Sequence, residues 1–187
     1  MAKQITVGID IGGTNTAIGF VDRDGTCVFE TSIPTKQYVE IEPYLQNLAT
    51  IITQQLSLHP EVELVGIGVG APNANYHRGT IEEAPNLAWK GTVQFCTKLG
   101  AYFPGIKVTI TNDANAAAMG EMIYGAAKGI RDFIVITLGT GLGSGIVVNG
   151  DLVYGHDGFA GEVGHTTVFP NGRQCGCGKK GCLETYV

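Results

Sequence analysis

A chain of 187 residues, 44% of them apolar, is long enough to bury the core of one domain or one and a half. Its formal charge of −5, without a long run of one sign, excludes the electrostatic footprint of a nucleic-acid-binding protein. The N-terminus has no basic stretch followed by an apolar segment, and no apolar run approaches the ~18 residues of a membrane span. We therefore expect a cytoplasmic protein without nucleic-acid or membrane partners.

Strand and helix patterns alternate along the first two thirds of the chain. In chain order we expect strands over 5–10, 16–21 and 27–32, a helix over 41–56 ending near 59–60, a strand over 64–69, a long loop over 71–90, a helix over 93–102 and a strand over 108–111. The helix over 41–56 has one apolar face, because its apolar residues recur at helical spacing.

The last third begins with an Ala-rich helix from 112 to about 127. We expect a strand over 133–138 to follow, and then a hairpin with strands over 146–148 and 152–154. This order of elements predicts an α/β fold with a mixed sheet. We divide the chain into an N-terminal domain over 1–115 and the start of a second domain over 116–187.

Glycine is the compositional outlier, and its clusters mark two turns. The chain holds 28 glycines, about twice the usual share of ~7%. The first glycine turn (residues 10–14) and the second glycine turn (139–145) both leave a strand, and their backbone N–H groups are suited to cradle phosphate. Both turns run into another strand rather than a helix, which argues against a dinucleotide-binding fingerprint, and a P-loop motif is lacking. For each turn alone, a plain tight hairpin is an equally good interpretation.

Two aspartates near these motifs have carboxylates that can bind a cation or accept a proton. Asp10 ends a strand directly before Gly12, Gly13 and Thr14, where it is suited to hold hydrated Mg²⁺ while the turn meets phosphate oxygens. Asp113 follows a strand and opens a helix, where a general base for phosphoryl transfer would be favoured in its ionised form. The alternative role for the helix start is an N-cap, and that role is compatible with a catalytic one.

A cluster of metal-binding side chains lies near the end of the chain. His165, Cys175, Cys177 and Cys182 fall within 18 positions, and three thiols with one imidazole suit a closed tetrahedral Zn²⁺ site. The alternative, a set of free buried thiols, fits poorly among glycines and lysines. We assign the other two cysteines, Cys27 and Cys96, to the core because they lie in apolar strand and helix patterns.

Two glutamates are tied in sequence to this cluster. Glu162 lies three residues before His165, and Glu184 lies two residues after Cys182. Turns anchored by a metal would hold such carboxylates rigidly enough to accept hydrogen bonds from sugar hydroxyls. His165 has two ring nitrogens, so one is available for zinc and the other for a sugar. The alternative for both glutamates is an ordinary solvated surface position.

Together, these motifs resemble one known family. They occur in the order Asp10-Ile11-Gly12-Gly13-Thr14, Asn112-Asp113-Ala114-Asn115, Leu138-Gly139-Thr140-Gly141, Gly161-Glu162-Val163-Gly164-His165 and Cys175-Gly176-Cys177-Gly178-Lys179-Lys180-Gly181-Cys182-Leu183-Glu184. This set resembles the ROK family (repressors, open reading frames and kinases), and its glucokinases in particular, over nearly the whole chain. The resemblance implies the actin-like, ribonuclease-H-like ATPase fold, with ATP and a hexose bound between two domains.

The resemblance also implies a role for each motif. Asp113 matches the catalytic base for the sugar 6-hydroxyl, and the sugar ligands match Asn86, Asn112, Asp113, Glu162, His165 and Glu184. The ATP phosphate loops of the family are matched by two segments of this chain. The matching residues are Asp10, Gly12, Gly13 and Thr14 in the first, and Gly139, Thr140 and Gly141 in the second. The zinc ligands match His165, Cys175, Cys177 and Cys182. The implied cofactors are therefore ATP, Mg²⁺ and a structural Zn²⁺, and the family usually forms dimers or tetramers.

The chain departs from the family pattern at both ends. The repressors carry an N-terminal helix-turn-helix, whereas the first strand here is expected to begin by Ile5. Full-length members continue beyond a position equivalent to Val187, so we expect a truncated second domain with the adenosine pocket lying further on. Such a fragment is expected to expose apolar surface and to be inactive by itself.

The activity that the resemblance implies is ATP-dependent phosphorylation of a hexose. The favoured reaction is glucose to glucose 6-phosphate. One alternative is a kinase for fructose, mannose or an N-acetylhexosamine. A second is a sugar-binding regulator without catalysis, against which the retention of Asp113 and both glycine turns argues. The third, a zinc-stapled α/β domain without activity, leaves Asp10 and Asp113 unexplained.

Overall fold

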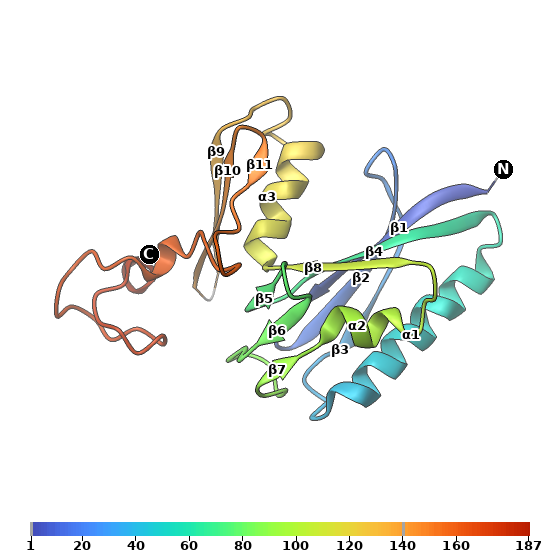
Figure 1. Ribbon diagram of the computed structural model, residues 1–187, viewed down its shortest axis with the longest axis horizontal. Coiled ribbons are helices and arrows are strands. Elements are labelled where there is room, and N and C mark those ends of the chain that lie inside the picture. The colour runs from blue at the N-terminus through green and yellow to red at the C-terminus, as the bar shows by residue number, and fades with distance from the viewer. Residues whose placement is uncertain (1, 140) are drawn as a thin grey trace. The chain divides into compact units, whose positions relative to one another are not determined.

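The computed structural model describes residues 2–139 and 141–187, and it divides into two compact units (Figure 1). Unit 1 covers Met1–Asp113 and unit 2 covers Ala114–Val187.

Unit 1 is built on a five-stranded mixed sheet with the order β3-β2-β1-β4-β8. The strands are β1 (Lys3–Ile11), β2 (Asn15–Asp22), β3 (Cys27–Pro34), β4 (Val62–Gly70) and β8 (Lys107–Thr111). The first three are antiparallel neighbours, whereas β4 and β8 run parallel to β1. The mixed α/β sheet predicted from the sequence is therefore confirmed. In the parallel part, Asp10 pairs with Gly70, which pairs with Thr111, so the carboxyl ends of β1, β4 and β8 lie in line.

Two helices of unit 1 lie next to each other beside this sheet (Figure 1). Helix α1 (Ile41–Leu58) buries one face, as its sequence periodicity predicts, and Lys98 of α2 (Phe95–Gly100) forms an ion pair with Glu42 of α1. The buried face of α1 joins the alternating apolar residues of β1, β2 and β4 in one core. Helix α2 is shorter than the predicted 93–102, because residues 92–93 form a strand instead.

The stretch predicted as a long loop contains strands of its own. A small antiparallel sheet consists of β5 (Ala74–Asn75), β6 (Thr80–Glu82) and β7 (Thr92–Val93). The predicted loop over 71–90 is wrong to that extent, since these strands are too short to produce a readable alternation.

Cys27 is exposed at the start of β3, so the expectation of a core position is wrong for this residue. Strand β3 is an edge strand, and only Ile33 of its eight residues is buried. Cys96 is half-buried and packs against the core. An edge strand that covers little of the core does not need apolar side chains along its length, which explains the difference.

Unit 2 has a three-stranded antiparallel sheet with the order β11-β10-β9. Its strands are β9 (Phe133–Leu138), β10 (Leu142–Val148) and β11 (Asp151–Leu152), the last shorter than the predicted 152–154. Helix α3 (Asp113–Ile123) packs against β10. A Cβ atom on Gly145 would lie 2.5 Å from Cβ of Ala118, so this close approach requires glycine in the strand and small residues in the helix.

Helix α3 ends four residues earlier than the predicted Ala127. The Glu121 carboxylate accepts a hydrogen bond from N–H of Ala126 at 2.7 Å, and N–H of Ala127 reaches back to the carbonyl of Glu121. These bonds terminate the helix at a turn through Gly125, although the alanine composition favours helix further along.

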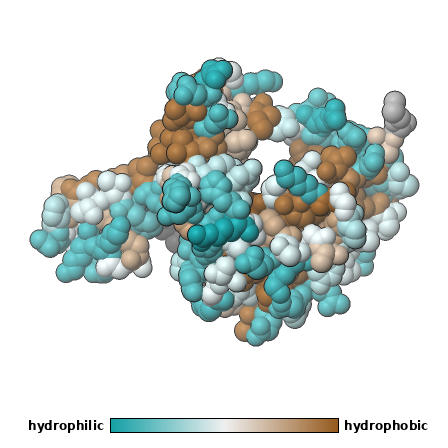
Figure 2. Space-filling view, viewed as in Figure 1, coloured by the Kyte–Doolittle hydropathy of each residue, from teal (hydrophilic) through white to brown (hydrophobic). Residues whose placement is uncertain are grey.

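Residues 153–187 contain only two short 3₁₀ helices, η1 (Val163–His165) and η2 (Leu183–Tyr186). The alternate residues Ile134, Ile136 and Leu138 of β9 are exposed, and unit 2 carries a large apolar surface in Figure 2. Among the described residues, no helix combines the length and apolar character that crossing a bilayer requires.

Candidate active site

The first glycine turn joins the antiparallel strands β1 and β2. N–H of Gly12 donates to the carbonyl of Asn15 at 3.0 Å, which closes the turn. The carbonyl of Thr14 accepts two hydrogen bonds, from N–H of Thr35 at 2.9 Å and from N–H of Lys36 at 3.2 Å. The end of the turn is thus held by the segment that precedes α1.

Gly13 packs directly against the Asn86 loop (residues 84–87). A Cβ atom at Gly13 would lie 2.7 Å from the carbonyl oxygen of Asn86, so only glycine allows the two segments to meet. The loop is fixed by its neighbours, since Ala84 and Leu87 are buried while Asn86 itself is exposed. The structure therefore brings together the first glycine turn and the predicted sugar ligand Asn86.

Asp10 and Asp113 lie at the same edge of the sheet of unit 1. Asp10 stands near the end of β1, and Asp113 follows β8 and opens α3. Partial burial raises the pKa of Asp10, and the negative charge of Asp113 raises it further. The two carboxylates are close enough to repel each other, and titratable groups perturbed in this way cluster at functional sites. Asn112 directly precedes α3, next to this pair.

The predicted bounds of the second glycine turn (139–145) are too long, because β10 begins at Leu142 rather than at the predicted 146. Residues 142–145 pair with β9 from Leu138 onward, so they belong to the strand. N–H of Gly139 donates to the carbonyl of Gly141 at 3.0 Å. Thr140, a predicted phosphate-loop residue, lies outside the described residues. A Cβ atom at Gly141 would lie 2.8 Å from Oε2 of Glu184, so this turn adjoins a predicted sugar ligand.

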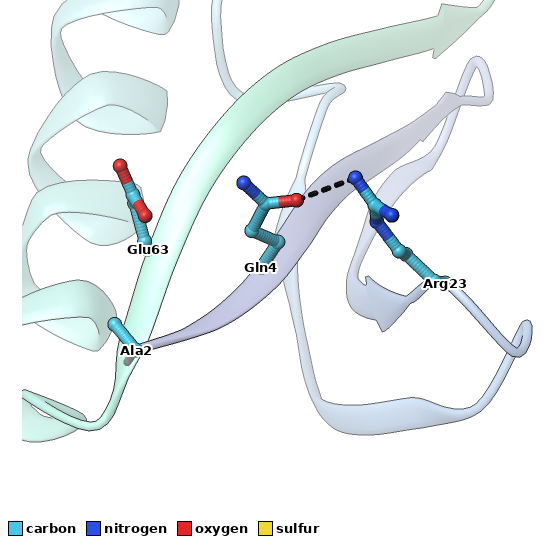
Figure 3. Close-up of a pocket in the computed structure, with 4 residues that line it drawn as sticks. All are labelled: Ala2, Gln4, Arg23 and Glu63. Carbon is cyan, nitrogen blue, oxygen red and sulfur yellow. Dashed lines mark hydrogen bonds between the residues drawn. The ribbon is translucent and has the colours of Figure 1, made fainter.

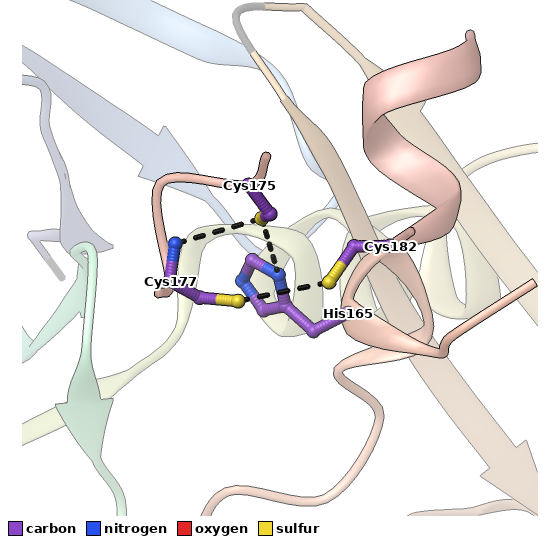
Figure 4. Close-up of side chains that lie close together, drawn as sticks. All are labelled: His165, Cys175, Cys177 and Cys182. Atoms are coloured by element: carbon purple, nitrogen blue, oxygen red, sulfur yellow. Dashed lines mark hydrogen bonds between the residues drawn. The ribbon is translucent and has the colours of Figure 1, made fainter. Parts of the chain in front are cut away.

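The four predicted zinc ligands converge in unit 2, as Figure 4 shows. One ligand atom from each of His165, Cys175, Cys177 and Cys182 lies within 4.8 Å of all the others. Nδ1 of His165 is 3.6 Å from Sγ of Cys175, and Sγ of Cys177 is 3.7 Å from Sγ of Cys182. A tetrahedral ion with Zn–S bonds of about 2.3 Å separates its sulfur ligands by about 3.8 Å, so these residues fit Zn²⁺.

Glu184 lies against the same cluster. Sγ of Cys175 donates to Oε1 of Glu184 at 2.7 Å, and this bond is the main reason that the pKa of Cys175 is raised to about 12. Nδ1 of His165 is 3.3 Å from the same oxygen. The sequence spacing predicted that Glu184 would accompany the metal ligands, but it gave no sign of direct contact with Cys175.

The segment that carries the predicted zinc ligands is braced by residues that the sequence pattern did not indicate. Arg173 lies over the ring of Tyr186, 4.8 Å from its centroid, and donates to the carbonyl of Thr185 at 2.6 Å. The hydroxyl of Tyr186 accepts from N–H of Arg173 at 2.8 Å. These contacts fix η2, which carries Glu184.

Ser144 is a further residue that the sequence pattern did not indicate. Its hydroxyl donates to the carbonyl of Gly161 and accepts from N–H of Val163 at 3.2 Å. The turn that carries Glu162 is thereby held against β10. A buried serine between two glycines of a strand is the signal that would have indicated such a role.

A separate hollow lies at the opposite end of β1 (Figure 3). Its lining residues are Ala2, Gln4, Arg23 and Glu63, and Nη2 of Arg23 donates to Oε1 of Gln4 at 2.7 Å. Gln4 is near the start of β1, whereas Asp10 is near its end. The hollow is therefore remote from the glycine turn and contributes nothing to the candidate site.

Comparison with known proteins shows to which family the chain belongs. The model of the ROK family matches residues 6–187, and the chain belongs to that family. Glucokinase from Halalkalibacterium halodurans is 41% identical over 196 residues, covering all of this chain and 57% of the relative. A xylose repressor from Caldicellulosiruptor bescii is 36% identical over 184 residues, covering 97% of this chain and 46% of the repressor.

The solved structures agree with the sequence relatives. A ROK family glucokinase from Streptomyces griseus, in complex with glucose and AMPPNP, has a TM-score of 0.79 and 37% sequence identity to this chain. The alignment covers 98% of this chain and 57% of that structure. The predicted actin-like ATPase fold is thus confirmed, and the chain spans little more than half the length of the relatives it matches.

Proposed function

We propose that the protein containing this chain is an ATP-dependent hexose kinase that phosphorylates glucose at its 6-hydroxyl. The observation that carries the proposal is the pairing of Asp10, beside the first glycine turn, with Asp113 at the start of α3. Phosphoryl transfer requires a carboxylate to accept the proton of the attacking hydroxyl and a separate group to hold the phosphate-bound cation. A sugar-binding domain without chemistry has no need for the second carboxylate.

In this mechanism Asp113 accepts the proton of the 6-hydroxyl as the sugar oxygen attacks the γ-phosphorus. The bond between the γ-phosphorus and the β,γ-bridging oxygen breaks, and ADP leaves with that oxygen. Most of the rate enhancement comes from positioning the hydroxyl, Asp113 and the nucleotide in line. Asp10 would hold Mg²⁺ through water, and Mg²⁺ when bound neutralises charge on the phosphates.

The proposed sugar ligands are those that the sequence motifs predict. We assign Asn86, Asn112 and Asp113 of unit 1, with Glu162, His165 and Glu184 of unit 2, to its hydroxyls. Gly12, Gly13 and Thr14, and Gly139, Thr140 and Gly141, are assigned to the phosphates. Zn²⁺ would have a structural role on His165 and the three cysteines, because a Cys₃His set leaves no open position for substrate.

A regulator that binds sugar without transferring phosphate is the second candidate. The likeness to a xylose repressor favours it, since that repressor covers 97% of the same residues. Isothermal titration with an ATP analogue separates the two, because a sugar sensor would not bind it. A coupled assay for ADP with a panel of glucose, fructose, mannose and N-acetylhexosamines then identifies the substrate, and size-exclusion chromatography with light scattering tests the expected dimer or tetramer.

A further inference from the structure

A buried cluster links the first glycine turn to the Asn86 loop. Tyr44 of α1 is fully buried, and its hydroxyl shares a hydrogen bond of 2.9 Å with Oγ1 of Thr16, two residues after the turn. Thr16 is also fully buried and shares a second bond of 2.8 Å with Oγ1 of Thr35. Burial raises the pKa of the Tyr44 phenol, which therefore remains a protonated donor at all physiological pH values.

The other side of Tyr44 contacts the segment that carries Asn86. The rings of Tyr44 and Trp89 lie 4.5 Å apart between centroids, and Trp89 is buried three residues after Asn86. Nε1 of Trp89 donates to the carbonyl of Tyr38 at 3.1 Å. The aromatic contact and the buried hydrogen bond both restrict the positions of the groups that they join.

A short strap (residues 35–38) completes the connection along the backbone. N–H of Thr35 donates to the carbonyl of Thr14, and N–H of Tyr38 donates to the carbonyl of Thr35 at 3.1 Å. The strap thus runs from the first glycine turn to Tyr38, whose carbonyl Trp89 contacts. Tyr44 contacts Thr16, which bonds to the first residue of the strap, and Trp89, which bonds to the last. Gly13 and Asn86 belong to the same assembly, since the backbone at Gly13 packs directly against the carbonyl of Asn86.

We propose that Tyr44 is a positioning residue, whose hydroxyl holds the first glycine turn in the place that bound nucleotide requires while its ring supports the Asn86 loop. The inference rests on the proposed kinase function. Tyr44 itself is fully buried, so its effect on substrates passes through Thr16 and Trp89.

The test uses Tyr44→Phe and Thr16→Val in the full-length protein. Tyr44→Phe keeps the ring that contacts Trp89 and removes only the hydroxyl. We expect KM for MgATP to rise about three- to tenfold, because the loss of one neutral hydrogen bond changes an equilibrium by about that factor. KM for the hexose should stay within about twofold of wild type. The double variant should be no worse than Thr16→Val alone, because both changes remove the same bond.

Ile52→Val is the matched control. Ile52 is fully buried on the same face of α1 as Tyr44, but it lies two helical turns away from the hydroxyl cluster. The variant should lower the melting temperature by a comparable amount without changing KM for MgATP. If Tyr44→Phe behaves like Ile52→Val in KM as well as in melting temperature, Tyr44 is only a core residue and the proposal is overturned.

Hydrogen exchange separates this inference from the proposed function. Amides over residues 12–17 and 35–38 should exchange faster in Tyr44→Phe and Thr16→Val than in Ile52→Val, whether or not the protein turns over any sugar. A wild-type protein that is inactive with every hexose refutes the kinase proposal. Unchanged exchange in both variants refutes the role of Tyr44.

Discussion

Asp10 and Asp113 repel each other at the edge of one sheet, although Asp10 lies near the end of the first strand of unit 1 and Asp113 follows the last strand. The alignment of β1, β4 and β8 in parallel register produces this pairing, because it brings the carboxyl ends of distant strands to one level. Two like charges that approach each other in this way disfavour the ionised form of at least one of them. Their retention is consistent with a catalytic purpose, and it leads to the first two predictions.

Replacing Asp113 by Asn should reduce kcat by about 10²–10⁴, the usual contribution of a general base. The amide keeps the size of the side chain and its position at the start of α3, so hexose affinity measured by calorimetry should remain within about threefold. Replacement of the exposed Asp24, in the β2–β3 turn of the same unit, is the control for an unrelated loss of charge. Near-wild-type turnover by Asp113→Asn would remove Asp113 from the mechanism.

Replacing Asp10 by Asn should abolish nucleotide-dependent activity and yet raise the melting temperature at pH 7. The folded protein raises the pKa of Asp10, so this group contributes stability below its ordinary pKa of 3.8 and loses that contribution as the pH rises through the raised value. The gain from Asp10→Asn should therefore disappear when the pH falls below about 4, where the wild-type carboxyl is protonated too. A gain that is independent of pH would contradict the charge explanation.

Two glycines of unit 2 should respond to alanine in opposite directions. Gly145→Ala should cost about 1–3 kcal/mol of unfolding free energy, because the new Cβ would overlap Ala118 and the carbonyl of Ala114. Gly120→Ala, in the interior of α3, meets nothing within 4 Å and should stabilise by about 0.5–1 kcal/mol. Chemical denaturation of both variants measures the difference, and equal effects would mean that α3 does not pack on β10 as described.

Removing the proposed zinc should loosen the segment over 160–187. The segment is mostly irregular and depends on cross-links, so chelation should speed its hydrogen exchange and weaken hexose binding, while the exchange of β1 stays unchanged. Elemental analysis should give about one zinc per chain, the stoichiometry of a closed four-ligand site.

Cysteine variants provide the control for that experiment. Cys177→Ser should lose the metal, whereas Cys27→Ser should retain it, although both side chains are exposed. Verified zinc-free protein with unchanged hexose affinity would show that the metal and the sugar ligands are not coupled.

Much of this architecture was accessible from the sequence because the patterns were long or chemically specific. The 3.6-residue repeat of α1 and the apolar runs of β1 and β4 define the layers of unit 1 without further information. The order of the His165 and cysteine motifs was enough to predict that the four side chains converge. The short strands β5 to β7 were missed because two or three residues carry no periodicity.

The supporting contacts of the site could not be predicted in the same way. The positions of Thr16, Thr35 and Tyr44 in sequence give no indication that three hydroxyls meet in the core. The contact of Glu184 with Cys175 depends equally on the backbone path of η2, which Arg173 and Tyr186 fix. Such contacts follow from tertiary packing, and local sequence patterns do not encode them.

The most direct test of the central claim is hexose-dependent ADP release by the full-length protein, with the phosphorylated product identified by mass spectrometry and ³¹P NMR. We predict turnover with glucose, a 6-phosphate product, and loss of that turnover in Asp113→Asn. Failure of every hexose to release ADP, or turnover that survives in Asp113→Asn, would contradict the assignment of this chain to an Asp113-dependent hexose kinase.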